Sequence, residues 1–283
     1  MPRTLKLYIA GVVAAGAAAL VVTALRFPID PRIGQGLLAG NPNSAWFGVG
    51  FWICLTLVAS ALPVQMPRGT MVAVSIAPII AAISLGGPTA GALVAAIGTF
   101  EVREVRGRIP WYGTLVNHAG LVLPAIAGGI VAEYIGRGSL LPSVDFLATL
   151  AGAAVFFALN ALLTAQLVAL RTGEPFRAVF SADARSVYAG VLALAPLGWL
   201  MAKIFSISQG AGWWATLLFA LPLYTTRLAN HRFVEMREMF TQTIGALAEA
   251  VDKRDPFTSK HSHRVKQIAV DIGKEMRVSA QEL

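Results

Sequence analysis

The chain changes character within FVEMREMFTQTIGALAEAVDKRDPFTSKHSHRV, residues 233–265, where a very apolar sequence becomes charged. The first half of this stretch repeats apolar residues at steps of three and four, which is the spacing of a helix with one apolar seam. Two such seams would pair as a coiled coil, and the alternative is that the seam packs on the chain's own C-terminal domain. The seam consists of Phe233, Met236, Phe240, Ile244, Leu247 and Val251.

A second helix is predicted directly after the seam. The Asp255-Pro256 step breaks the first helix, because proline lacks the backbone N–H and restricts the residue before it. Thr258 or Ser259 is expected to cap the next helix. The apolar face of that helix consists of Val265, Ile268, Ala269, Ile272 and Met276.

The composition predicts an all-α, polytopic membrane protein. The chain is 56% hydrophobic and 13% charged, whereas soluble domains carry about 25% charged residues. The net charge of +8 fits loops that face anionic lipid. No basic face on a soluble module is visible, so nucleic acid is not an expected partner. The single cysteine, Cys54, excludes an internal disulfide.

Eight spans are predicted, with six as the alternative, because a span takes roughly 20 apolar residues. The third and fourth runs are short and are joined by Leu85-Gly86-Gly87-Pro88, so they form a tight hairpin or two half-helices that meet inside the protein. No Ala-x-Ala-type site follows the first run, which is therefore a span and not a signal peptide. The predicted spans are 5–26, 44–63, 70–86, 88–101, 113–135, 146–170, 186–206 and 211–228.

Basic residues predict the topology. With the N-terminus inside, nine of them lie in cytoplasmic segments and four lie in outer loops. The positive-inside rule then places both termini in the cytoplasm, in a multi-pass protein of the cell inner membrane. The cytoplasmic set is Arg3, Lys6, Arg68, Arg103, Arg106, Arg108, Arg171, Arg177 and Arg185, and the outer set is Arg26, Arg32, Arg137 and Lys203.

Small residues within the spans indicate close helix packing, because in lipid van der Waals contact replaces the hydrophobic drive between helices. The glycines expected at such contacts are Gly11, Gly16, Gly87, Gly91, Gly98, Gly120, Gly128 and Gly129.

Polar groups inside a membrane are functional candidates by default. The candidate ligand or sensor residues here are Asn117, His118, Glu133 and Asn160. Asn117 and His118 begin the fifth predicted span, where they could sense a ligand or a proton near the inner face. The alternative for all four is hydrogen bonding between helices. The charged residues Glu101, Arg103, Glu104 and Arg106 are expected in a solvated cytoplasmic loop.

The run ALAEAVDKRDPFT (246–258), with His261-Ser262 and Arg264-Val265 after it, closely resembles the opening of HD-GYP domains. This resemblance covers about the last forty residues. It implies a cyclic di-GMP phosphodiesterase with a centre of two or three metal ions, iron or manganese, joined to a sensor. It divides the chain into a membrane sensor and anchor (1–228), a linker helix (229–252), and the first helices of an HD domain (253–283). Pairing of the apolar seam would make the protein a homodimer through the linker helix.

By the same resemblance, His261 is the first metal ligand of the complete domain. The family's His-Asp pair, its later histidines and its Gly-Tyr-Pro segment would all lie beyond Leu283. The catalytic set is therefore incomplete in these 283 residues, and no metal is expected to bind them. Asp271-Ile272-Gly273-Lys274 is not the family's motif, because residue 270 is Val and the distance from His261 is too short.

A second resemblance concerns residues 88–119. They are similar to the multi-span region found ahead of HD-GYP domains, and more loosely to the vitamin-binding subunits of energy-coupling-factor transporters. The rival function is therefore a small-molecule binding or transport module in which the membrane bundle itself is active.

Overall fold

The computed structural model describes residues 2–38, 40–61, 64–65, 71–72, 75–100, 104, 107, 109–136, 141–207, 212–219, 232, 235–236, 238–247, 250 and 256–276. The chain divides into two compact units, Met1–Pro63 with Val72–Thr225, and Val64–Met71 with Thr226–Leu283. Helices make up nearly all of the regular structure, and one two-stranded sheet pairs β1 (Val64–Gln65) with β2 (Met71–Val72). The helices are α1 (Arg3–Arg26), α2 (Arg32–Gln35), α3 (Ser44–Ser60), α4 (Ile76–Gly98), α6 (Trp111–Gly136), α7 (Pro142–Thr172), α8 (Phe176–Phe205), α9 (Gly212–Leu217) and α11 (Pro256–Glu275).

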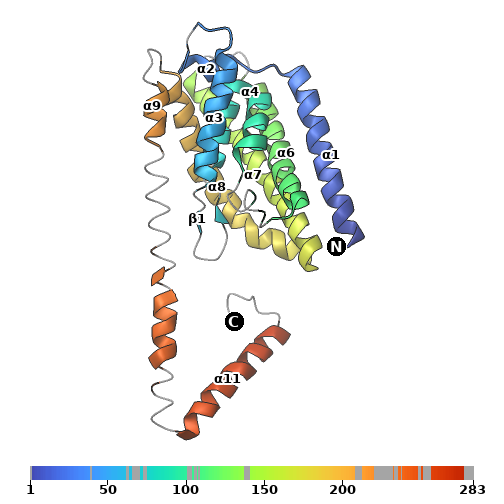
Figure 1. Cartoon of the computed structure of the whole chain (residues 1–283), viewed down its shortest axis with the longest axis vertical. Coiled ribbons are helices and arrows are strands. Elements are labelled where there is room, and N and C mark those ends of the chain that lie inside the picture. The colour runs from blue at the N-terminus through green and yellow to red at the C-terminus, as the bar shows by residue number, and fades with distance from the viewer. Residues whose placement is uncertain are drawn as a thin grey trace. The chain divides into compact units, whose positions relative to one another are not determined.

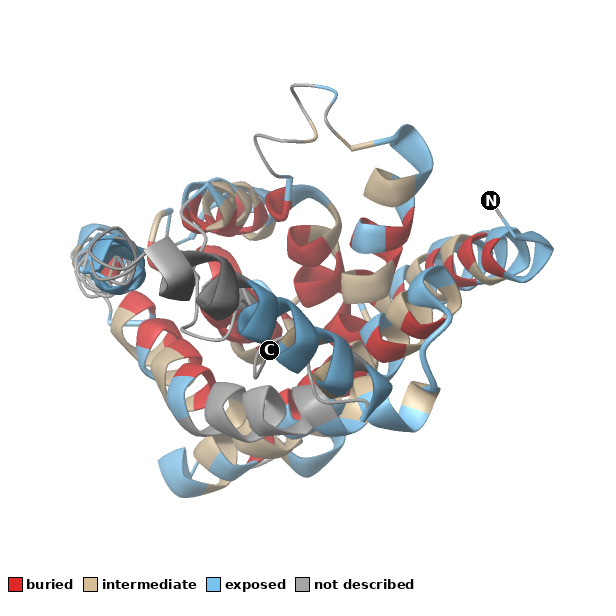
Figure 2. Cartoon of the chain, turned by 90° about the horizontal axis from the view of Figure 1, so that it is seen from below, coloured by how far each residue is buried: buried red, intermediate tan, exposed pale blue. Residues whose placement is uncertain are grey.

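Within the described residues, four helices are long and apolar enough to cross a membrane when only their residue number and composition are counted, namely α1, α4, α6 and α7. Shorter apolar helices cover Ser44–Ser60 and Ala193–Phe205. This confirms the coarse prediction of an all-α, multi-pass membrane protein. Figure 1 shows α4 in the middle of the bundle and α1 at its edge. In Figure 2 the buried residues lie on the faces that these helices turn toward one another.

The predicted spans agree with α1, α3, α6 and α7 within a few residues. The seventh is longer than predicted, because α8 begins at Phe176 and only its second half is strongly apolar. Of the eighth predicted span, α9 covers Gly212–Leu217, and 220–228 lies outside the described residues.

The third and fourth predicted spans form one folded-back element. Gly87 interrupts α4 with φ 77° and ψ −169°, a conformation that only glycine adopts readily. A Cβ at Gly91 would press into the side chain of Ile83, although eight residues along a straight helix are about 12 Å apart. Two arms, 76–86 and 88–98, therefore lie against each other. Each is roughly 16 Å long, about half of a bilayer's hydrocarbon core, which favours half-helices over two full spans.

Both ends of this folded-back helix are fixed by polar contacts. At the bend, the Thr89 hydroxyl bonds the carbonyl oxygens of Thr23 and Phe27 at the end of α1. The Asp30 N–H bonds the Gly86 carbonyl at 3.2 Å. At the open end, the Ser60 hydroxyl donates to the Gly98 carbonyl at 3.1 Å. The bend is thus held next to the end of α1, and the open end next to the end of α3.

Close glycine contacts hold the remaining helices together. Gly128 of α6 meets Gly152 of α7, and a Cβ at Gly152 would lie 2.6 Å from the Gly128 carbonyl oxygen. Backbones that approach this closely gain dispersion contacts along their length. The prediction is confirmed at Gly16, Gly91, Gly98, Gly128 and Gly129, and it is wrong at Gly11, Gly87 and Gly120, where a Cβ would meet no atom within 4 Å.

The second unit carries helices whose apolar faces are exposed. Residues 238–247 are helical, and α11 begins at Pro256, which confirms the predicted second helix. The predicted cap at Thr258 or Ser259 is wrong, because both residues lie inside α11, which begins at Pro256. Proline fits the first helical position, where its missing N–H costs nothing. The predicted seam residues Phe233 and Val251 lie outside the described residues. The exposed apolar residues include Met236, Phe240, Ile244 and Leu247, then Val265, Ile268 and Ile272 on α11, and Met276 directly after it.

Candidate functional site: a buried histidine–glutamate contact

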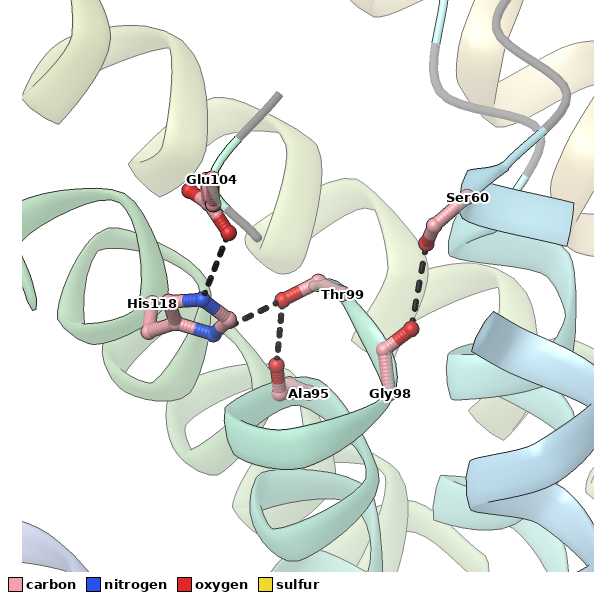
Figure 3. A network of polar contacts seen from close by, with 6 residues as sticks. All are labelled: Ser60, Ala95, Gly98, Thr99, Glu104 and His118. Atoms are coloured by element: carbon pink, nitrogen blue, oxygen red, sulfur yellow. Dashed lines mark hydrogen bonds and ion pairs between the residues drawn. The ribbon is translucent and has the colours of Figure 1, made fainter. Parts of the chain in front are cut away.

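His118 lies in α6, facing the open end of α4, and both of its ring nitrogens have a polar neighbour (Figure 3). Nδ1 is 3.2 Å from the hydroxyl of Thr99, the residue that follows α4. Nε2 is 3.2 Å from a carboxylate oxygen of Glu104. The ring of Phe100 covers the imidazole, with ring centroids 4.3 Å apart. The contact therefore joins α6, the end of α4 and the segment that follows α4.

The polar contacts continue from His118 into the backbone of α4. The Thr99 hydroxyl donates to the Ala95 carbonyl at 2.7 Å. Its oxygen can at the same time accept from Nδ1 of His118 when that nitrogen carries a hydrogen. Thr99 therefore links the imidazole to the last turn of α4.

The pair is shielded from solvent, since the side chains of His118 and Glu104 are 11% and 2% exposed. In such surroundings an electrostatic contact is stronger than in water, and breaking it leaves a buried polar group without that partner. The prediction that Glu104 belongs to a solvated loop is therefore wrong. Its predicted companions Glu101, Arg103 and Arg106 lie outside the described residues.

The other candidate residues do not join this site. Asn117 is exposed next to His118, and Glu133 is half-buried near the far end of α6, about 22 Å further along the helix. Asn160 is half-buried in the middle of α7. His261 lies in α11, in the second unit. Of the predicted sensor residues, His118 is the one that belongs to the contact with Thr99 and Glu104.

The sequence analysis missed a second polar contact, between α7 and α8. An Asp145 carboxylate oxygen accepts from Lys203 Nζ at 2.6 Å and from Trp199 Nε1 at 3.0 Å. Lys203 also lies over the Trp199 ring, 5.8 Å from its centroid. Both charged side chains are partly exposed, so this pair ties two helix ends together and contributes modestly to stability. Asp145 also lies in the first turn of α7, where the helix dipole favours an anion.

A double-mutant cycle on His118 and Glu104 is expected to show a coupling free energy of about 1–3 kcal/mol, the range for residues in direct polar contact. The single variants His118→Ala and Glu104→Ala each leave a buried partner behind, whereas the double variant removes both. The measurement is thermal unfolding of the purified protein in detergent. The control is a second cycle made of Asn117→Ala and Glu104→Ala. It should show no coupling, because Asn117 is exposed. Additive effects of His118→Ala and Glu104→Ala would contradict the contact.

No protein-family model, curated protein or solved structure matches this chain. Among the residues that the structure describes, no three His, Cys, Asp or Glu side chains lie close enough to hold a metal ion. The functional argument therefore rests on the chain's own residues.

Proposed function

We propose that this chain is the membrane sensor and anchor of a metal-dependent cyclic di-GMP phosphodiesterase of the HD-GYP type. The observation that carries the proposal is the run 246–265, which resembles the opening of that domain. The helix α11 begins at Pro256 within this run and contains His261. A charged helical segment after a membrane bundle is what a domain entering the cytoplasm requires.

In this proposal His261 is the first of several metal ligands, and the others come from sequence after Leu283. The metal, iron or manganese, would activate water for attack on a phosphodiester when bound. His261 alone cannot hold a bridged metal centre, so the contribution of these 283 residues is to position the head and to regulate it.

In the membrane path that fits the proposal, the folded-back α4 enters and leaves the membrane on the same side and does not cross it. Six full crossings or eight both give an even number, so both termini lie on the same side of the membrane in either case. The excess of basic residues makes that side the cytoplasm of a bacterial inner membrane in this proposal. The buried His118–Glu104 contact is the proposed sensing element, because it is a polar contact shielded from solvent that joins three segments of the bundle. A change there moves the end of α4 relative to α6.

A second candidate function is a small-molecule binding or transport module, and the folded-back α4 favours it. Half-helices that meet inside a bundle are typical of transporter sites, where their ends face the substrate. The two candidates differ in where the activity resides. The bundle alone would be active in the second, whereas a cytoplasmic head is required in the first.

The test is hydrolysis of cyclic di-GMP by two purified proteins, supplied with manganese or iron. The 283-residue chain is expected to be inactive. Of its four histidines only His261 matches the family's ligand set, and the chain contains no His-Asp pair. The full gene product is expected to hydrolyse the dinucleotide. Turnover by the 283-residue chain would refute the assignment of the missing ligands. A gene that ends at Leu283, or a longer product without turnover, would refute the proposed function.

A further inference from the structure

We propose that residues 233–251 form a parallel, in-register, two-stranded coiled coil with the same segment of a second copy of this chain. The proposal does not depend on the hydrolase. It rests on the exposure of the seam, on the placement of charges around it and on the membrane orientation of the two copies.

The seam residues that the structure describes are largely exposed within one chain. Phe240 is 65% exposed, Ile244 51% and Leu247 61%. An isolated helix of this length is marginal in water, and Gly245 weakens it further. An exposed apolar stripe on such a helix therefore needs a covering surface.

The sequence around the seam fits a two-stranded partner. With Phe240 and Leu247 at d positions, Ile244 and Val251 fall at a positions. β-Branched residues at a with leucine at d favour parallel dimers over larger assemblies. The next a position towards the N-terminus is Arg237, and a single polar residue at a is a known device for fixing register.

Between Phe240 and Val251, the seam and the positions that flank it carry no charged residue. The positions that flank it in these two heptads are Thr241, Thr243, Ala248 and Ala250, which are small and uncharged. The acidic residues Glu235, Glu238, Glu249 and Asp252 fall at b and f positions, on the outer side of the helix. In the two heptads from Phe240 to Val251 the copies therefore meet without like charges opposite one another, whereas Arg237 would face Arg237 of the second copy.

Insertion in the same membrane determines the direction and the register of the two linker helices. Two copies inserted in one bilayer have the same orientation, so their helices leave it on the same side and run parallel. The same number of residues separates the last apolar run from the seam in both copies, so equivalent residues meet at the same height. This excludes an antiparallel pair and favours a second copy over an unrelated helix.

The test is disulfide cross-linking in native membranes, with Cys54→Ser as the background because Cys54 is the chain's single cysteine. Ile244→Cys and Leu247→Cys place identical residues face to face. They should give roughly tenfold more cross-linked dimer than the outward-facing controls Gln242→Cys and Gly245→Cys, because a disulfide needs Cβ atoms about 4 Å apart. Equal yields at the four positions, higher yields at the controls, or no dimer at any position would overturn the proposal.

A second measurement does not depend on oxidation. Leu247→Asp puts a charge into the seam and should shift the protein in mild detergent from twice the chain mass to the chain mass. Gln242→Asp adds the same charge on the outer side of the helix and should leave the dimer intact. Dissociation by both variants would show that added charge, and not the seam, controls assembly. A wild-type protein with the chain mass would overturn the proposal.

Discussion

Adding one methyl group at Gly128 is expected to lower the free energy of unfolding by about 1–3 kcal/mol, the usual cost of overpacking a tight contact. In Gly128→Ala the new Cβ would press into the carbonyl oxygen of Gly152. That atom belongs to the backbone of a long helix and cannot rotate away. The two helices must therefore separate, which loosens the contact between α6 and α7 along its length.

The matched control is Gly120→Ala in the same helix, where a Cβ would meet no atom within 4 Å. This variant should be unchanged or more stable by up to about 1 kcal/mol, because alanine is the better helix former. The measurement is the midpoint of thermal unfolding of both variants in detergent. Equal destabilisation by the two variants would contradict the close crossing of α6 and α7.

The long helices could be predicted because hydropathy averages over many residues and tolerates local irregularity. The predicted span 146–170 became α7, Pro142–Thr172. Its ends also carry local signals, since proline suits the first turn, and Gly173 takes the left-handed conformation, φ 79°, that ends a helix.

The fold of α4 could be predicted only as a choice between alternatives. Hydropathy identifies a run of apolar residues, but it does not distinguish a straight helix from two helical arms that lie side by side. The bend depends on the positive φ of Gly87 and on contacts made after folding, such as Gly91 against Ile83. The Gly-Gly-Pro sequence marked the position of the bend but not its angle.

Of the two ionisable residues of the candidate site, His118 was predicted and Glu104 was not. His118 was identified because a titratable residue inside a span needs a partner, but Glu104 was assigned to solvent because charged residues surround it in the sequence. Its burial depends on where the segment after α4 lies against α6, and local sequence patterns do not contain that information. The signal that could have identified Glu104 is the need of a histidine inside a span for a polar partner.

If the bundle controls a hydrolase head through a paired helix, the rotational phase of that helix must matter. One residue inserted after Thr243 turns everything beyond it by about 100°. Seven inserted residues restore the seam, because the apolar pattern repeats every seven residues from Phe233 to Phe240 and from Phe240 to Leu247. The one-residue insertion therefore tests the rotation of the helix. The seven-residue insertion tests its length, because it leaves the direction of the apolar seam nearly unchanged.

The decisive measurement is the rate of cyclic di-GMP hydrolysis by the full gene product in membranes, with no insertion, with one residue and with seven residues inserted after Thr243. The one-residue insertion is expected to change the rate by a factor of roughly 5 or more, the scale of ordinary allosteric coupling. The seven-residue insertion should return the rate close to that of the unmodified protein. Equal effects of the two insertions, or no hydrolysis by the unmodified protein, would contradict a membrane sensor that acts through a paired helix.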